Sequence, residues 1–390
     1  MSIRPKADTA KARKSGMRWV ILAVLLVTIQ FAGGIAPGQQ PAATVRAIPA
    51  PATPLPPEAQ SAAVTRFSFI DYGDTRSGVD GTAPQPVHSQ LISNMLAAIA
   101  RLKSTEYPVR FVLQSGDGVT NGREVNQWNN SYVDVVSRIT KEANIPYYLI
   151  PGNHDVTAGA SVDTPQRNEG LRNYFQLMSK LIPPDGSPRR LSGYPTFAFG
   201  YGNTFVIGID SDISPDDKQF NWVKSQLEGL DRRRFVNVVA FMHHPPFTSG
   251  GHRVVEIATA GVRIRYMPLF RTHHVALVLG GHDHEFEHWV EHYTDGSGTH
   301  RIDQIVSAGG GAPAYAYSGE PDTADYLAAG ATQKVQLEHI VKPKPAAADN
   351  KPHFIIVRVD GTQLSVEVVG LPPAADFKPY GKDVFDLRDQ

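Results

Sequence analysis

Residues 150–155 read Ile-Pro-Gly-Asn-His-Asp, and they continue the short apolar run Tyr147–Ile150. An apolar run that stops at Pro-Gly is typical of a buried strand that ends in a turn. A string such as Gly-Asn-His-Asp arises by chance on the order of once in hundreds of chains of this length. The segment therefore predicts a strand end that carries chemistry, with Asn153 and His154 at its tip.

Four further apolar runs end in polar side chains of the same kind. They close in Tyr-Gly-Asp-Thr-Arg at 72–76, Ser-Gly-Asp-Gly at 115–118, His-His-Pro at 243–245 and Gly-His-Asp-His at 281–284. Successive motifs are separated by more than the ~30 residues that a parallel crossover unit takes. The chain can thus return each time to the same edge of a sheet, where α/β proteins bind their ligands.

The chain around these motifs alternates between strand-like and helix-like segments. Strands are expected at 67–72, 109–114, 147–150, 204–209, 236–242, 275–279 and 302–307, helices at 87–103, 124–143, 168–181 and 215–230, and hairpins at 196–209 and 354–369. This alternation predicts an α/β fold with much parallel sheet. The Ala-, Gly-, Pro- and Lys-rich residues 310–351 are expected to be loop.

The N-terminal residues are expected to lie outside this fold. Residues 1–36 combine a basic start, the apolar run Trp19–Ile29 and small residues, which match a secretory signal peptide. A retained membrane anchor and a buried helix are the alternatives. The Pro- and Ala-rich residues 37–63 predict an extended linker. The expected domain is 64–370, followed by a tail at 371–390, in a protein that is exported (periplasmic or secreted) or anchored facing outside the cytoplasm.

The overall composition excludes several classes of function. The 390 residues include no cysteine, so disulfides, thiolate metal ligands and a cysteine nucleophile are ruled out. The 38 basic residues balance the 38 acidic ones, which argues against a nucleic-acid partner. Any transition-metal site must therefore use His, Asp, Asn and Glu.

The strand-end residues can form such a site. Asp117 can bridge two cations through its two oxygens. Mixed oxygen and nitrogen ligands without sulfur suit Fe, Zn or Mn, and two metals ~3.5–4 Å apart can clamp a phosphoryl group and generate a hydroxide between them. His154 is placed to act on the leaving group, as a general acid or by stabilising charge.

Each motif taken singly also has an ordinary structural explanation. A Gly-Asp at a strand end is usually a turn, and two histidines spaced as His282 and His284 occur in edge strands without metal. His252, His273, His274, His288 and His292 have no partner spacing and are expected outside the site. The ordered set of five motifs is far rarer than any one of them, so the joint interpretation is the stronger one.

In this order the motifs resemble the calcineurin-like metallophosphoesterases, which include purple acid phosphatases, phosphodiesterases and exported phosphatases. The matching residues are Asp74, Gly116-Asp117, Gly152-Asn153-His154-Asp155, His243-His244-Pro245 and Gly281-His282-Asp283-His284. The resemblance implies a four-layer sandwich of two mixed β-sheets flanked by helices. It also implies that Asp74, Asp117 and His284 hold one metal ion, that Asp117, Asn153, His243 and His282 hold a second, and that His154 is catalytic. His244 is the fallback for His243.

The first motif departs from the family pattern. Many family members carry a metal-binding His two residues after the first Asp, and purple acid phosphatases supply a Tyr three residues after the second-motif Asp. This chain has Arg76 and Thr120 at those positions. The first site is thus one protein ligand short. The expected alternatives are that water or a remote residue such as His88 fills the position, or that this metal binds weakly. Arg76 is expected either to bind the substrate phosphate or to pair with a nearby carboxylate.

A second question concerns the first ligand itself. Asp71 is a rival for Asp74. Asp74 is preferred, because a glycine precedes it and a loop begins there, whereas Asp71 sits inside the apolar run.

The leading hypothesis is therefore a two-metal phosphoesterase that hydrolyses small phosphomonoesters by attack of a metal-bound hydroxide. Its catalytic residues would be His154 and Arg76, and its metals would be drawn from Fe, Zn and Mn. A phosphodiesterase that uses the same site is the first alternative. A non-catalytic module that binds phosphate or metal is the second.

Overall fold

A computed structural model describes residues 43–156, 164–372 and 377–387. The signal peptide or anchor predicted for 1–36 lies outside these residues. Within the described ranges, no helix is both long enough and apolar enough to cross a lipid bilayer.

The described chain alternates between strands and helices. The strands are β1 (Arg66–Tyr72), β2 (Val109–Gln114), β3 (Tyr147–Leu149), β4 (Phe197–Tyr201), β5 (Thr204–Ile209), β6 (Asn237–Met242), β7 (Leu277–Gly280), β8 (Phe286–Asp295), β9 (Gly298–Ser307), β10 (Gln336–Val341), β11 (His353–Asp360), β12 (Gln363–Gly370) and β13 (Val384–Asp386). The α-helices are α1 (Pro86–Leu102), α2 (Val133–Arg138), α3 (Asn153–Val156), α4 (Pro165–Met178), α5 (Asp217–Glu228), α6 (Ile257–Gly261), α7 (Met267–Thr272) and α8 (Ala324–Ala329). Wider helical turns extend α2 on both sides, as η2 (Gln127–Tyr132) and η3 (Ile139–Ala143), and join α6 to α7 as η5 (Val262–Tyr266). Short 3-10 turns lie at η1 (Glu58–Ser61), η4 (Ser211–Ile213), η6 (Ala331–Gln333) and η7 (Ala347–Asp349).

The strands form two mixed sheets. One has six strands in the order β13-β12-β11-β1-β2-β3, and the other has seven in the order β10-β8-β9-β7-β6-β5-β4. Strands β1, β2 and β3 run parallel, as do β5, β6, β7 and β9. The strand ends that carry the sequence motifs therefore lie at the carboxyl edges of these two parallel groups.

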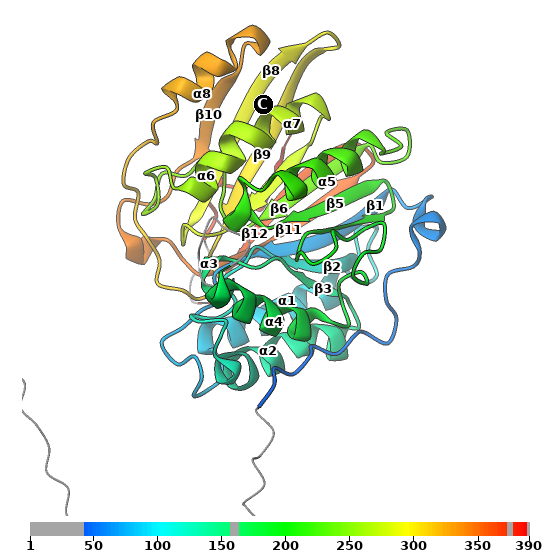
Figure 1. Ribbon diagram of the computed structural model, residues 1–390, viewed down its shortest axis with the longest axis vertical. Coiled ribbons are helices and arrows are strands. Elements are labelled where there is room, and N and C mark those ends of the chain that lie inside the picture. Colours follow the sequence, from blue (N-terminus) through cyan, green and yellow to red (C-terminus); the bar gives the residue numbers. More distant parts are fainter. Residues whose placement is uncertain (1–42, 157–163, 373–376, 388–390) are drawn as a thin grey trace, which may run out of the picture. The chain divides into compact units, whose positions relative to one another are not determined.

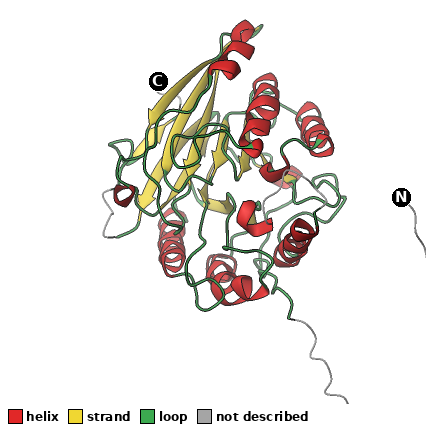
Figure 2. Cartoon of the chain, turned by 60° about the vertical axis from the view of Figure 1, so that its left-hand side comes forward, coloured by secondary structure: helices red, strands yellow, loops and turns green. Residues whose placement is uncertain are grey.

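The two sheets pack face to face through an aromatic core. Phe111 of the six-stranded sheet lies 5.1 Å, between ring centroids, from both Phe69 on the neighbouring strand and Phe199 of the other sheet. Tyr148 stacks on Phe199 at 4.5 Å. Helices α1, α2 and α4 cover the outside of the six-stranded sheet, and α5, α6 and α7 cover the seven-stranded sheet (Figures 1 and 2). The fold is the expected α/β four-layer sandwich of two mixed β-sheets flanked by helices.

Three segments expected to lack structure are parts of the fold. Within the predicted linker 37–63, the described part from residue 43 onward packs on the domain: Val45 and Ile48 are buried, and the Ile48 amide donates to the Leu177 carbonyl at 2.9 Å. Residues from Ala43 onward belong to the same compact unit as the two sheets. Residues 310–351 contain α8 and β10, and the described part of the tail contains β13, which pairs with β12.

Candidate metal centre

Six side chains from the five motifs converge where the two sheets meet. Asp74 follows β1, Asp117 follows β2, Asn153 follows β3, His243 follows β6, and His282 and His284 follow β7. Ligand atoms of Asp74, Asp117 and His243 lie within 4.8 Å of one another, as do those of His243, His244 and His282. Parallel strands end at one edge of a sheet, so segments distant in sequence meet there.

Three of these residues have a strained backbone. Asp74, Asp117 and His282 have φ values of 63°, 54° and 72°, in the left-handed region that only six non-glycine residues of the described chain adopt. Such a conformation costs on the order of 1–3 kcal/mol when the surrounding structure imposes it, and it concentrates at functional sites. All three residues come just after a strand, at the edge where the motifs meet.

The glycines of the motifs leave room for the ligands. A Cβ on Gly152 would lie 2.3 Å from Asp117 Oδ1, and one on Gly116 would lie 2.6 Å from His243 Nδ1. Gly116 also has a φ of 89°. Each glycine is therefore needed for the close approach of the backbone to a ligand side chain.

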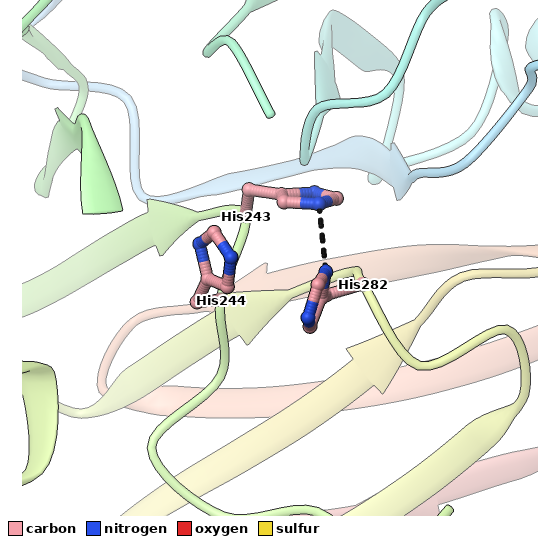
Figure 3. Close-up of side chains that lie close together, drawn as sticks. All are labelled: His243, His244 and His282. Carbon is pink, nitrogen blue, oxygen red and sulfur yellow. Dashed lines mark hydrogen bonds between the residues drawn. The ribbon is translucent and has the colours of Figure 1, made fainter. Parts of the chain in front are cut away.

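The donor set of Asp117, Asn153, His243 and His282 presents lone pairs to a common point. His243 Nδ1 donates to the Ser115 carbonyl at 2.8 Å, so the ring turns its other nitrogen, Nε2, toward the centre. Nε2 lies 2.9 Å from Asn153 Oδ1, 3.1 Å from His282 Nδ1 and 3.4 Å from Asp117 Oδ1 (Figure 3 shows the two histidines). A cation placed between these oxygen and nitrogen atoms could bind all four of them.

His282 is held as a neutral ligand. Burial, reinforced by the adjacent His243, holds the pKa of His282 well below its ordinary value. Glu256 Oε2 lies 3.3 Å from His282 Nε2, which makes no hydrogen bond among the described residues, while Nδ1 faces His243 Nε2. The His282 amide donates to Asp74 Oδ2 at 3.0 Å. This donor set fits Zn, Mn or Fe.

The remaining donors form a second position, beside Arg76. Its atoms are Asp74 Oδ1, Asp117 Oδ2 and His284 Nε2. His284 Nδ1 donates to the Pro313 carbonyl at 2.7 Å, so Nε2 is the ring nitrogen that faces the centre. Arg76 Nε lies 3.3 Å from Asp117 Oδ2, and Arg76 Nη2 lies 3.2 Å from His284 Nε2. Of the two expected roles for Arg76, the structure contains the pairing with a carboxylate.

His154 lies at the rim of the cluster. Its amide donates to Asp117 Oδ1 at 3.0 Å, and its ring Nδ1 donates to the Thr120 carbonyl at 2.7 Å. The ring orientation is thus fixed through Nδ1. Asp155 supports the same loop, since its Oδ1 accepts from the Gly118 amide at 2.9 Å and its Oδ2 from the Gly152 amide at 2.9 Å.

The rivals and substitutes named from the sequence lie outside the cluster. Asp71 accepts from Ser115 Oγ at 2.9 Å, and burial raises its pKa to about 8. His88 uses both nitrogens, at 2.8 Å from Tyr72 Oη and 2.9 Å from Gln85 Oε1, and burial lowers its pKa to about 3. His88 therefore does not supply the missing ligand.

Two further positions have other partners. The Thr120 hydroxyl donates to Asp80 Oδ2 at 2.9 Å and is not directed at the cluster. His244 lies beside His282, with ring centroids 4.2 Å apart, but its Nδ1 pairs with Ser211 Oγ at 2.9 Å. His244 remains a neighbour of the donor set.

Glu256 and Tyr315, which lie near the centre, were missed in the sequence, and His252, which was expected outside the site, lies against it. His252 lies 4.0 Å from His282 between ring centroids, and its Nδ1 is 2.7 Å from Glu256 Oε1. Tyr315 stacks on His284 at 4.3 Å. His252 and Glu256 are four residues apart in a loop, which is too weak a signal alone, and Tyr315 lies in a segment expected to be featureless.

The sequence profile described as "Calcineurin-like phosphoesterase" matches residues 87–286, slightly more than half of the chain. The matched range contains Asp117, Asn153, His243, His282 and His284. Asp74 and Arg76 precede it.

Individual relatives agree with the profile. "Purple acid phosphatase 23" of Arabidopsis thaliana is 26% identical over 145 residues, covering 37% of this chain and 30% of the relative. "Fe(3+)-Zn(2+) purple acid phosphatase 12" of the same plant is 24% identical over 182 residues, covering 45% and 36%. The chain thus matches about a third of the length of these relatives. The structure of purple acid phosphatase PPD1 from yellow lupin (Lupinus luteus) has the same fold, with a TM-score of 0.58 at 14% identity over 83% of this chain and 54% of that chain.

Proposed function

Because the chain belongs to the calcineurin-like phosphoesterase family, we propose that it is a metal-dependent hydrolase of phosphate esters, with small phosphomonoesters as substrates. The observation that carries the proposal is the close approach of Asn153 Oδ1, His243 Nε2, His282 Nδ1 and Asp117 Oδ1. Carboxylate, amide and imidazole atoms gathered in this way form a donor set that suits a cation, and phosphoryl transfer is the chemistry that such cations support.

The residues of this set would hold the metal ion, which we propose to be Fe, Zn or Mn. When bound, the metal would draw charge from the phosphoryl oxygens and lower the pKa of water. The resemblance implies a further cation at Asp74, Asp117 and His284, and one relative is named for an Fe–Zn pair. Arg76 lies against two of these three residues.

His154 and Arg76 would act on the substrate directly. His154 is anchored through Nδ1, so its Nε2 can give a proton to the leaving oxygen or stabilise the charge there. The Arg76 guanidinium has N–H groups beyond the two that contact Asp117 and His284, and these can bind phosphoryl oxygens. We also propose that the protein is exported, from its N-terminal sequence.

The test uses the full chain, stripped with a chelator and then supplied with Mn²⁺ or Zn²⁺. Hydrolysis of p-nitrophenyl phosphate should appear only with metal and exceed that of bis-p-nitrophenyl phosphate. His154→Ala should lose ~10²–10⁴-fold in turnover while it keeps its metal content. The matched control is His292→Ala, which removes a histidine paired with Glu338 on β10 and should change neither quantity.

Other outcomes would redirect the assignment. A preference for the diester would make the protein a phosphodiesterase with the same site. Bound metal with no hydrolysis of either ester would make it a binding module.

A further inference from the structure

Arg76 makes contact with two of the three atoms that a first metal ion would need. Its Nε is 3.3 Å from Asp117 Oδ2, and its Nη2 is 3.2 Å from His284 Nε2. A guanidinium is planar, permanently charged and carries only donors. It therefore meets a carboxylate oxygen and an imidazole lone pair in the same way that a cation does.

The two contacts compete with metal binding because each uses the atom that the metal would use. His284 Nδ1 is committed to the Pro313 carbonyl, and the ring is stacked on Tyr315 at 4.3 Å, so only Nε2 can face the centre. The Nε2 lone pair accepts one partner. A dication placed on it would also stand against the positive charge of Arg76.

The backbone holds Arg76 in this position. The amides of Thr75 and Arg76 both donate to the Asp117 carbonyl, at 2.9 and 3.2 Å, and Thr75 Oγ1 donates to the Gly118 carbonyl at 2.9 Å. The Arg76 side chain is only 19% exposed. Residues 75 and 76 are thus fastened to the loop that carries Asp117, and the guanidinium has little room to leave the centre.

The residues considered as the missing ligand have other partners. Thr120 donates to Asp80, and His88 is enclosed by Tyr72 and Gln85. Asp74 Oδ1 has no hydrogen-bond partner among the described residues. It lies 3.5 Å from His284 Nε2, the nitrogen that Arg76 contacts.

We propose that the Arg76 guanidinium takes the place of the first metal ion, so that the chain binds one metal, at Asp117, Asn153, His243 and His282. Arg76 supplies the second positive charge that the phosphoryl group meets. This inference rests on the proposed function, since it concerns the same centre.

The experiment is metal stoichiometry, measured on the full chain by isothermal titration with Mn²⁺ and by mass spectrometry of the dialysed protein. The wild type should bind one Mn²⁺ per chain at the centre. Arg76→His replaces the guanidinium with a common metal ligand and should raise the number to two. Arg76→Gly, which only removes the guanidinium, should do the same with weaker affinity. Arg123→His is the matched control, because Arg123 contacts Asn121 within its own loop. This variant should still bind one Mn²⁺ per chain.

Electron paramagnetic resonance distinguishes a pair of ions from two separate ones. The wild type should give the six-line spectrum of isolated Mn²⁺, and Arg76→His should give the spectrum of a spin-coupled pair. An uncoupled second ion would lie elsewhere, for example at His274, Asp295 and His300, and would not count toward the centre.

Each other result has a definite meaning. A coupled pair in the wild type, or one uncoupled ion in both folded Arg76 variants, would overturn the assignment of Arg76. No bound metal in the wild type would overturn the proposed function instead.

Discussion

Gly152→Ala should abolish tight metal binding without unfolding the protein. A Cβ at this position would lie 2.3 Å from Asp117 Oδ1 and 2.7 Å from the Asp117 amide nitrogen, whereas real Cβ contacts essentially never fall below 3.0 Å. The carboxylate or the loop must therefore shift by about 0.7 Å. Metal–ligand distances tolerate only about ±0.2 Å. We expect a loss of about 100-fold in metal affinity, the upper end of the range for groups that orient ligands.

The assay is titration of chelator-stripped full chain with Zn²⁺, alongside circular dichroism to confirm the fold. Gly78→Ala is the control, because a Cβ there meets nothing within 4 Å, and it should bind as the wild type does. If Gly152→Ala is folded and binds Zn²⁺ with wild-type affinity, then Asp117 Oδ1 is not a ligand and the centre is assembled differently.

Three further predictions concern stability, each measured by urea unfolding. Burial lowers the pKa of His88 from 6.5 to about 3, so the folded protein loses stability as the pH falls below 6.5. In His88→Gln, the decrease in the free energy of unfolding between pH 7.5 and 5 should be smaller by about 2 kcal/mol. The same decrease in variant and wild type would refute this. Arg167→Ala would leave the buried Asp210 unpaired and should cost about 3–5 kcal/mol, whereas a cost below 1 kcal/mol would show that Asp210 is neutral. Phe111→Ala should cost about 3–5 kcal/mol through the cavity between the sheets, and a near-zero change would mean that the sheets close over it.

The strands that the sequence predicts best are those buried on both faces. Strands β1, β2, β5 and β6 read as nearly continuous apolar runs, because a central parallel strand is covered from both sides. Strand β8 reads Phe-Glu-His-Trp-Val-Glu-His-Tyr and escaped prediction. Its buried Glu287 accepts hydrogen bonds from the Thr248 hydroxyl and the Ser249 amide in a distant loop, and from Trp289 Nε1 on the same strand.

The N-terminal segment illustrates a second limit of sequence interpretation. Its prolines predict an extended chain over 37–63; in the described part, 43–57 contains no helix or strand, whereas Glu58–Ser61 forms a 3-10 turn. They do not predict that Val45 and Ile48 find an apolar surface beside α4. Docking of an extended segment depends on a groove that other parts of the chain create.

The candidate centre was predictable where a ligand follows directly on a strand. Asp117, Asn153 and His243 each stand within a few residues of a strand end, so topology alone brings them together. Arg76 was left with two roles because its distance to Asp117 depends on how two loops pack. Glu256 was missed because it lies in the loop just before α6, and no sequence motif connects that loop to His282.

The most direct test of the metal centre is to follow p-nitrophenyl phosphate hydrolysis by chelator-stripped full chain while Mn²⁺ is added in steps. Turnover should be absent at the start, rise in proportion to the bound metal, and reach its maximum at one ion per chain. Turnover that does not depend on metal, or that stays absent with the ion bound at the centre, would contradict a metal-dependent phosphoesterase built on Asp117, Asn153, His243 and His282.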